Sequence, residues 1–448
     1  MIDQSRSAAY ELLRSVRIED SYANVVWPRI LRSHELMGRD AAFATDLAYG
    51  TLRGQGRYDA IAQACSARPW EQVDPELRDV VRLGIHQLLA MRVPDHAAVD
   101  SSCELARSIG YHDKGRIGFV NGLLRCVSRK NPAEWDDELS SQRNGRDSLA
   151  TLTSHPQWIV DAIADALAVH VQAEVSDEQL RAALEANNAP SRPMLALRDT
   201  SAERDPGLSA GKWLPSAAVV DAGIPADLPA VAEGRAIVQD EGSQLVVAAL
   251  LSVPVDPPES AWLDMCAGPG GKAVLLADAA AKAGINFQAV ELHEHRANLM
   301  RKLMGEPVSA EVLVADATTR PWGSQFFDRV LLDAPCTGIG ALRRRPEARW
   351  RRNQSDLVDL GKLQRQLLDV GLSSLRSGGV LGYVTCSPHV RETLDVIEEV
   401  LLHRDDMDVI DAREFIGHVP DLGPGPHLQL WPHIHGTDGM HLSLLRRR

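Results

Sequence analysis

Two short segments in the C-terminal half place a cysteine directly after a run of apolar residues. They are residues 333–338, of sequence DAPCTG, and residues 385–387, of sequence TCS. A lone cysteine is usually a small buried hydrophobic residue, but Cys336 and Cys386 are each followed by a hydroxyl residue at the predicted end of a strand. A thiolate is a strong nucleophile once its surroundings lower the thiol pKa from about 8.5. The pattern therefore predicts a covalent site, and the residue types alone do not say which sulfur attacks.

A glycine-rich loop, residues 266–272 of sequence CAGPGGK, follows an earlier predicted strand and opens a predicted helix. Glycines let the backbone pass close to a ligand, and a helix N-terminus offers unpaired N–H groups to an anion. The loop matches neither the GxGxxG dinucleotide loop nor the phosphate-binding loop that ends in GK[ST]. Glu291 ends the next predicted strand, where it can accept hydrogen bonds from ribose hydroxyls. Asp316 follows the third strand, where it can accept the exocyclic amine of adenine.

Glycine loop, ribose acid and adenine acid in this order predict binding of S-adenosylmethionine, with the helix N-terminus facing its carboxylate. Cys266, inside the loop, is expected to contribute its backbone rather than to react. The predicted cofactor contacts are Cys266, Ala267, Gly268, Pro269, Gly270, Gly271, Lys272, Glu291, Asp316 and Asp333.

Alternating strands and helices are expected to position these groups. Five apolar segments, 261–265, 287–291, 311–315, 329–333 and 380–385, are separated by helical patterns, which is typical of a parallel sheet with helices on both faces. Ligands of such sheets bind beyond the carboxyl ends of the strands. Because Cys336 and Cys386 both follow strand ends, we expect their strands to be neighbours and their sulfurs to face one pocket.

The remaining organisation follows from the patterning. We expect an all-helical domain over residues 1–132, a polar linker over 133–150, a small α+β domain over 151–235, and the α/β domain over 236–448. The chain has 448 residues and a net charge of −13, which argues against non-specific coating of nucleic acid but not against a local basic groove.

Six cysteines without CxxC pairs suit a reducing cytosol, so we expect any special cysteine to be reactive rather than bridged. The longest apolar stretch, 245–251, is far shorter than the ~18 residues that span a bilayer. We expect a cytoplasmic protein with no membrane association and no metal site, and a monomer.

Together the three C-terminal motifs resemble those of the RNA cytosine-C5 methyltransferases of the Fmu/Sun/NOP2 superfamily. The N-terminal part resembles a NusB-like RNA-binding domain in residues 43–53, 93–99 and 119–125. The fusion of such a domain to these methyltransferase motifs is similar to family members that act on small-subunit (16S) ribosomal RNA. The resemblance implies a helical NusB-like domain followed by a Rossmann-like class I methyltransferase fold. In one departure, relatives often carry Glu-Asn-Glu after the TCS motif, where this chain has Arg391-Glu392-Thr393.

The resemblance also implies catalytic roles. Cys386 attacks carbon 6 of the cytosine, Cys336 takes part in product release, and Asp333 contacts the cytosine edge, where charge develops in the ring. Another RNA such as tRNA, or a non-catalytic RNA-binding assembly factor, remains an alternative. A DNA cytosine methyltransferase is disfavoured because that family uses a Pro-Cys nucleophile, a different motif order and an extra target-recognition domain.

A basic segment just after Cys336 is the candidate contact for the RNA backbone. Arginine pairs with phosphate in bidentate fashion and tryptophan can stack on a base, whereas the usual alternative is a solvated charged helix face. The candidate RNA contacts are Arg343, Arg344, Arg345, Arg349, Trp350, Arg351 and Arg352.

Overall fold

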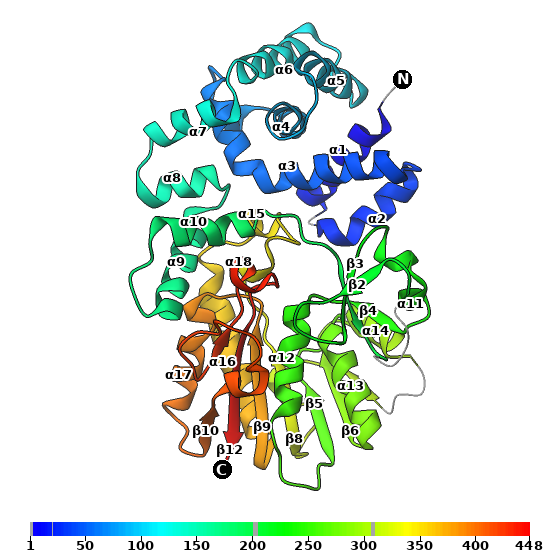
Figure 1. Cartoon of the computed structure of the whole chain (residues 1–448), viewed down its shortest axis with the longest axis vertical. Helices are drawn as coiled ribbons and strands as arrows, with labels where there is room; N and C mark the ends of the chain where they lie inside the picture. Colours follow the sequence, from blue (N-terminus) through cyan, green and yellow to red (C-terminus); the bar gives the residue numbers. More distant parts are fainter. Residues whose placement is uncertain (1–2, 20, 200–204, 306–309) are drawn as a thin grey trace. The chain divides into compact units, whose positions relative to one another are not determined.

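The computed structural model describes residues 3–19, 21–199, 205–305 and 310–448. The chain divides into two compact units, coloured along the sequence in Figure 1. The helical unit comprises residues 1–161, 176–189 and 342–351, and the sheet unit comprises residues 162–175, 190–341 and 352–448. Each unit is described by itself.

Apolar residues at helical spacing build the helical unit around α4 (Pro75–Leu89), whose Leu77, Val81 and Ile85 are fully buried. Figure 1 shows α4 end-on, next to α3, α5 and α6. The other helices are α1 (Gln4–Ile18), α2 (Ala23–Ser33), α3 (Gly38–Ala64), α5 (Asp95–Ser108), α6 (Lys114–Val127), α7 (Pro132–Ser141), α8 (Gly145–Leu152), α10 (Asp177–Ala186) and α15 (Ala348–Arg351). Helix α9 (Gln157–Val171) is divided between the two units.

The stretch predicted as a linker, 133–150, instead forms α7 and most of α8 within the helical unit. Asn131 begins α7 with a capping box: its side chain accepts from the backbone N–H groups of Ala133 and Glu134, and the Glu134 side chain accepts from the Asn131 N–H. Trp135 and Leu139 bury the inner face of the helix. The polar residues that suggested a linker form the caps and the exposed face, so the prediction was wrong.

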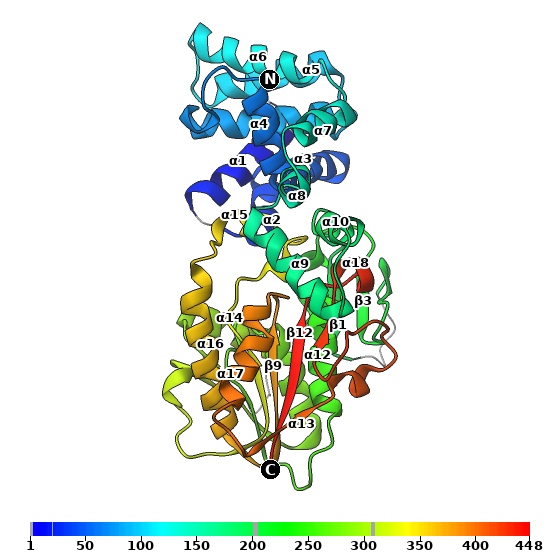
Figure 2. The same ribbon diagram turned by 90° about the vertical axis from the view of Figure 1, so that its left-hand side faces the viewer.

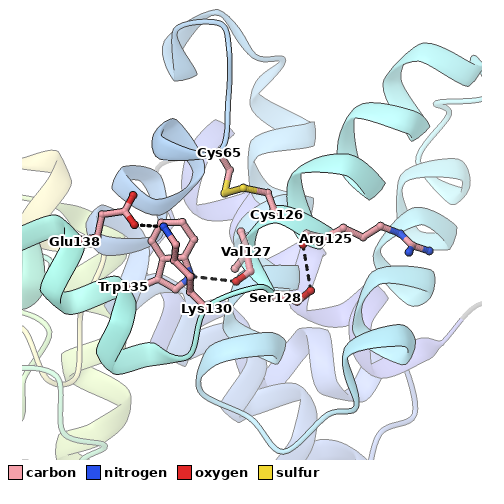
Figure 3. The surroundings of a disulfide bond; sticks show 8 residues. All are labelled: Cys65, Arg125, Cys126, Val127, Ser128, Lys130, Trp135 and Glu138. Atoms are coloured by element: carbon pink, nitrogen blue, oxygen red, sulfur yellow. Dashed lines mark hydrogen bonds and ion pairs between the residues drawn. A yellow bond between two sulfur atoms is a disulfide. The ribbon is translucent and has the colours of Figure 1, made fainter.

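A disulfide joins Cys65, at the C-terminal end of α3, to Cys126 in α6, with their Cα atoms 5.9 Å apart (Figure 3). Close by, the indole Nε1 of Trp135 donates to the carbonyl of Val127, and the Lys130 ammonium lies over the indole ring. The expectation that no cysteine is bridged is therefore wrong for this pair. Cysteines 61 residues apart carry no spacing signal, and only the packing of α3 on α6 brings them together.

Two sheets make up the sheet unit. The smaller is antiparallel, with strand order β2-β3-β1-β4, formed by β1 (Met194–Leu197), β2 (Leu208–Ala210), β3 (Ala217–Val220) and β4 (Ala236–Val238), and it is accompanied by the short helix α11 (Pro229–Ala232). The larger sheet has the order β10-β12-β9-β8-β5-β6-β7, with β11 pairing with β12.

The five expected parallel strands are consecutive in the larger sheet, from β9 to β7 at one edge. They are β5 (Ala261–Asp264), β6 (Asn286–Glu291), β7 (Ala310–Val314), β8 (Phe327–Asp333) and β9 (Leu375–Thr385), and β10 (Met407–Ile410), β11 (Leu428–Gln429) and β12 (His441–Arg447) add antiparallel pairs. Helices α12 (Glu241–Ser252), α13 (Gly271–Ala283) and α14 (Glu294–Met304) contribute to the core on one face, and α16 (Asp356–Ser373) and α17 (Leu394–Leu401) to the core on the other. Figure 2 shows α12 and α16 on opposite sides of β9. The short α18 (Pro432–His435) precedes β12.

Strands β8 and β9 are parallel neighbours, as predicted, with Leu331 opposite Gly382 and Asp333 opposite Val384. Both strands therefore end at the same edge of the sheet, and the segments that carry Cys336 and Cys386 leave from adjacent positions. Among the described residues, every helix is too short or too polar to cross a membrane.

Candidate active site

The two cysteines meet beyond the ends of β8 and β9. Cys336 Sγ and Cys386 Sγ lie 3.5 Å apart, at hydrogen-bonding distance for sulfur. The Gly340 N–H donates to the Cys386 carbonyl at 2.9 Å, which holds the two segments together. The hydrogen bond to Cys386, together with burial, raises the pKa of Cys336 well above its ordinary value. Cys336 is therefore the protonated member of the pair, and its S–H can donate to the sulfur of Cys386.

Glu392, to which the sequence assigned no catalytic role, connects the segment after Cys336 with the segment after Cys386. Its fully buried carboxylate accepts from the Thr337 backbone N–H at 2.7 Å and from the Thr337 hydroxyl. The Thr337 hydroxyl oxygen lies 3.2 Å from that of Ser387. Gln364 Nε2 donates to the same carboxylate, and the Tyr383 hydroxyl donates to the Glu392 carbonyl at 2.8 Å. The only signal in the sequence was a glutamate close after the TCS motif.

Lys272 and Asp333 form an ion pair beside the cysteines, with Lys272 Nζ 2.7 Å from Asp333 Oδ2. Burial alone lowers the pKa of a lysine, but Asp333 outweighs it and Cys386 adds to the effect, so the pKa of Lys272 is raised. Lys272 is thus a firmly charged ammonium whose field reaches the Cys386 sulfur. Lys272, the second residue of α13, thereby links the glycine loop to the end of β8.

Asp264, at the end of β5, is a second residue that the sequence analysis left without a role. It is fully buried, and its Oδ1 accepts from the Cys266 N–H at 3.3 Å. Burial and the charge of Asp333 raise the pKa of Asp264 to about 8. Its Oδ2 is buried without a hydrogen-bond partner among the described residues. A buried carboxyl oxygen without a partner beside the glycine loop fits the ammonium group of S-adenosylmethionine, whose positive charge would favour the ionised form of Asp264 and whose N–H groups would donate to Oδ2.

The glycine loop lies directly against Glu291. The Gly268 N–H donates to Glu291 Oε2 at 3.1 Å, and the His293 N–H donates to Oε1 at 2.8 Å. A Cβ on Gly268 would lie 2.1 Å from Glu291 Oε2, so only glycine fits this close approach. Gly270 has a φ of +117°, a conformation that favours glycine, and stands against Met300. The loop therefore places the N-terminal end of α13, which has no side-chain cap, close to the buried carboxylate of Glu291.

Leu292 follows the end of β6, and Asp316 lies just after the end of β7. Asp316 is exposed, and its Oδ1 accepts from the Thr318 N–H at 2.9 Å and from the Thr318 hydroxyl at 2.7 Å. Leu292 is 59% exposed beside Glu291, although leucine is usually buried. An exposed apolar side chain between two strand-end acids fits the flat face of an adenine. The residues present therefore fit the cofactor that the sequence analysis expects.

The predicted RNA-contact segment is grouped mostly with the helical unit, since residues 342–351 belong to it. Arg349 is fully buried: its guanidinium donates to the carbonyl of Ser154 and to Asn188 Oδ1, both at 2.8 Å, near the C-terminal ends of α8 and α10. Helix C-termini carry unpaired carbonyls that attract cations. A guanidinium in this position cannot reach a phosphate, so the structure contradicts the prediction for Arg349.

Two other arginines of the segment also serve the helical unit. Arg345 and Arg351 lie over the ring of Tyr22, and Arg351 donates to the carbonyls of Val16 and Ser21. Trp350 is 38% exposed, with one edge of its ring against Gly56 in α3. Arg343, Arg344 and Arg352 are half-buried. A run of charges in a sequence does not distinguish packed arginines from solvated ones.

Comparison with known proteins decides the family. The profile of the 16S rRNA methyltransferase RsmB/F family matches residues 253–446, and that of the NusB family matches residues 3–129. Ribosomal RNA small subunit methyltransferase B of Pseudomonas syringae is 32% identical over 465 residues, covering 98% of this chain and 96% of the relative. The chain belongs to the RsmB/F family. A Mycobacterium tuberculosis protein is 44% identical, covering 100% of this chain and 97% of its own length.

A solved structure shares the fold of this chain. The crystal structure of PH0851 superposes with a TM-score of 0.79 at 21% identity, covering all of this chain and 99% of the other. This RsmB/F member is thus an S-adenosylmethionine-dependent RNA methyltransferase. The predicted fold class is confirmed: a helical NusB domain precedes a Rossmann-like methyltransferase fold.

Proposed function

We propose that this protein methylates carbon 5 of one cytosine in small-subunit ribosomal RNA through a covalent bond between Cys386 and carbon 6. The supporting observation is the juxtaposition of two thiols 3.5 Å apart beside the Lys272 ammonium, at the carboxyl ends of neighbouring strands. Ordinary nucleophilic methyl transfer to an amine or hydroxyl needs no thiol, whereas carbon 5 of cytosine becomes nucleophilic only after addition at carbon 6.

In the proposed reaction the Cys386 sulfur, as thiolate, forms a bond to carbon 6, and the electrons of the C5–C6 double bond become available at carbon 5. The Cys336 S–H and the Lys272 ammonium stabilise the thiolate before attack. S-adenosylmethionine supplies an electrophilic methyl group. With that group on carbon 5, a base accepts the carbon 5 proton, the C5–C6 double bond forms again, and the C6–S bond breaks.

Cys336 serves the final step in this proposal. The departing Cys386 sulfur takes the bonding electron pair and leaves as a thiolate, which the S–H of Cys336 receives through a hydrogen bond. The raised pKa of Cys336 keeps that proton in place at neutral pH. Without this donor the leaving thiolate is less stable, so the adduct lasts longer.

Asp333 is proposed to contact the N3 edge of the cytosine, while its other partner, Lys272, fixes its orientation. Asp333 ends β8 and Lys272 lies in the first turn of α13, so charge that develops in the ring meets groups that the fold already holds in place. The target cytosine must be unpaired or flipped out, because a stacked base is inaccessible.

RNA backbone contacts are proposed for Arg343, Arg344 and Arg352, with Trp350 as a stacking platform. Arg345 and Arg351, which lie over Tyr22, contribute charge to the same segment. The net charge of −13 confines favourable contacts to such local clusters, so binding should weaken steeply with salt.

The test is transfer of a labelled methyl group to unmethylated 16S RNA and to small subunits, followed by mapping of the modified base. Cys386→Ala is expected to abolish transfer, and Cys336→Ala to accumulate a protein–RNA adduct on a denaturing gel. Swapped phenotypes would reverse the two roles. Labelling of tRNA alone would identify another substrate, and absence of cofactor binding by calorimetry would favour an assembly factor.

A further inference from the structure

The buried carboxylate of Glu392 contacts the segment after Cys336 and, through the Thr337 hydroxyl, the segment after Cys386. Two of its bonds go to Thr337, from the backbone N–H and the hydroxyl. Thr337 in turn meets Ser387, at 3.2 Å between hydroxyl oxygens. Glu392, Thr337 and Ser387 are all at least 97% buried. Each cysteine is thus attached to the same carboxylate through the residue that follows it.

The charges around the two sulfurs differ in sign. The hydrogen bond to Cys386 and burial raise the pKa of the Cys336 thiol most, and the nearby Glu392 carboxylate raises it further. The Cys386 sulfur interacts instead with the Lys272 ammonium. A negative neighbour favours the neutral thiol and a positive neighbour favours the thiolate. Of the two sulfurs, which lie 3.5 Å apart, Cys336 therefore keeps the proton and Cys386 the negative charge.

We infer that Glu392 is a positioning residue that holds Cys336 against Cys386 and keeps the proton on the Cys336 sulfur. This rests on the proposed function for its catalytic consequence, because the retained proton is the one that the leaving Cys386 thiolate meets. Glu392 touches neither sulfur and acts through Thr337 and through its charge. Its negative charge adds to the Cys386 contact and to burial in favouring Cys336 as the hydrogen-bond donor and Cys386 as the nucleophile.

Glu392→Gln removes the charge and keeps an oxygen that accepts from the Thr337 N–H. The first readout is alkylation of the free protein by iodoacetamide between pH 6 and 10, without RNA. Trypsin places the two thiols on different peptides, 330–343 and 377–391, so mass spectrometry measures each one separately. Cys336 is expected to react about tenfold faster at pH 8 in the Gln variant, which corresponds to a pKa lower by about one unit.

Two further variants separate charge from position. Glu392→Asp restores the charge and is expected to return the alkylation of Cys336 toward the wild-type rate. Thr337→Val keeps the carboxylate but removes the hydroxyl that connects it to Ser387. In that variant the alkylation midpoint of Cys336 should stay within a few tenths of a pH unit, while the protein–RNA adduct lasts several-fold longer than in wild type.

Asp328→Asn is the matched control, since Asp328 is also a buried carboxylate that accepts from backbone N–H groups, at the opposite end of β8. It should leave the reactivity of Cys336 unchanged in molecules that thermal unfolding shows to be folded. Equal pH profiles for Glu392→Gln and Asp328→Asn would overturn the inference. If wild type methylates no RNA, the proposed function fails, while the alkylation experiment still decides the role of Glu392.

Discussion

Replacing Gly268 by alanine tests whether the glycine loop and Glu291 form one binding element. The new Cβ would lie 2.1 Å from Glu291 Oε2 and 2.8 Å from its Cδ. The carboxylate must therefore move by about 1 Å to reach ordinary van der Waals contact. It cannot do so freely, because Glu291 is only 4% exposed and is held by the Gly268 and His293 N–H groups.

The magnitude follows from the bonds that this shift disturbs. A hydrogen bond to a charged group contributes about 1.5–3 kcal/mol, and the shift weakens at least the one from the Gly268 N–H, 3.1 Å long in the wild type. If Glu291 binds the ribose, the same displacement moves its oxygens from the hydroxyls. The affinity for S-adenosylmethionine should fall by about 10- to 150-fold.

Isothermal calorimetry with S-adenosylmethionine measures this change, and thermal unfolding shows that the variant is folded. Gly417→Ala is the control, because its backbone has φ −60° and the nearest atom to a new Cβ is 3.7 Å away. It should bind the cofactor as wild type does. An unchanged affinity for Gly268→Ala would refute the reasoning, since it would mean that Glu291 does not contact the ligand from its observed position.

Two predictions concern the helical unit. Burial lowers the pKa of His86 to about 4, so protonation of this side chain opposes folding, and up to about 3 kcal/mol of the free energy of unfolding is lost as the pH falls from 6.5 to 4. Hydrogen exchange of the α4 amides should show this loss in wild type and not in His86→Gln. An equal pH dependence in the two proteins would contradict the prediction. The Cys65–Cys126 disulfide joins cysteines 61 residues apart, and the lost chain entropy of the unfolded state stabilises the fold by about 4 kcal/mol. Dithiothreitol should lower the denaturant midpoint of wild type but leave that of Cys65→Ser unchanged. A wild-type midpoint that does not respond to the reductant would argue against the disulfide.

Patterns that depend on neighbours in the chain were predictable from the sequence. The parallel strands, the glycine loop and the proximity of Cys336 to Cys386 all follow from alternation and from the rule that parallel strands end at one edge. The acids at the strand ends were found for the same reason. These features need only local hydrophobic periodicity and the order of elements.

Features that depend on partners distant in the chain were not predictable. Glu392 is a single glutamate whose meaning comes from Thr337, 55 residues earlier. Arg349 belonged to a basic run, and only the fold supplies Ser154 and Asn188 as its acceptors. The capping box at Asn131 was a local signal for a helix, but its polar residues were interpreted as a linker.

The path of the chain through the helical unit has a consequence for how this protein can be divided. Residues 342–351 return to that unit from the catalytic sequence, and Arg349 and Glu347 are buried there against residues up to 324 positions away. A fragment that starts after residue 161 would keep the cysteines but lose the Ala23 N–H that donates to Glu347 and the Ser154 carbonyl that accepts from Arg349. Gene fusion or domain exchange at that boundary would therefore not yield two interchangeable modules, because a ten-residue stretch of the second belongs structurally to the first.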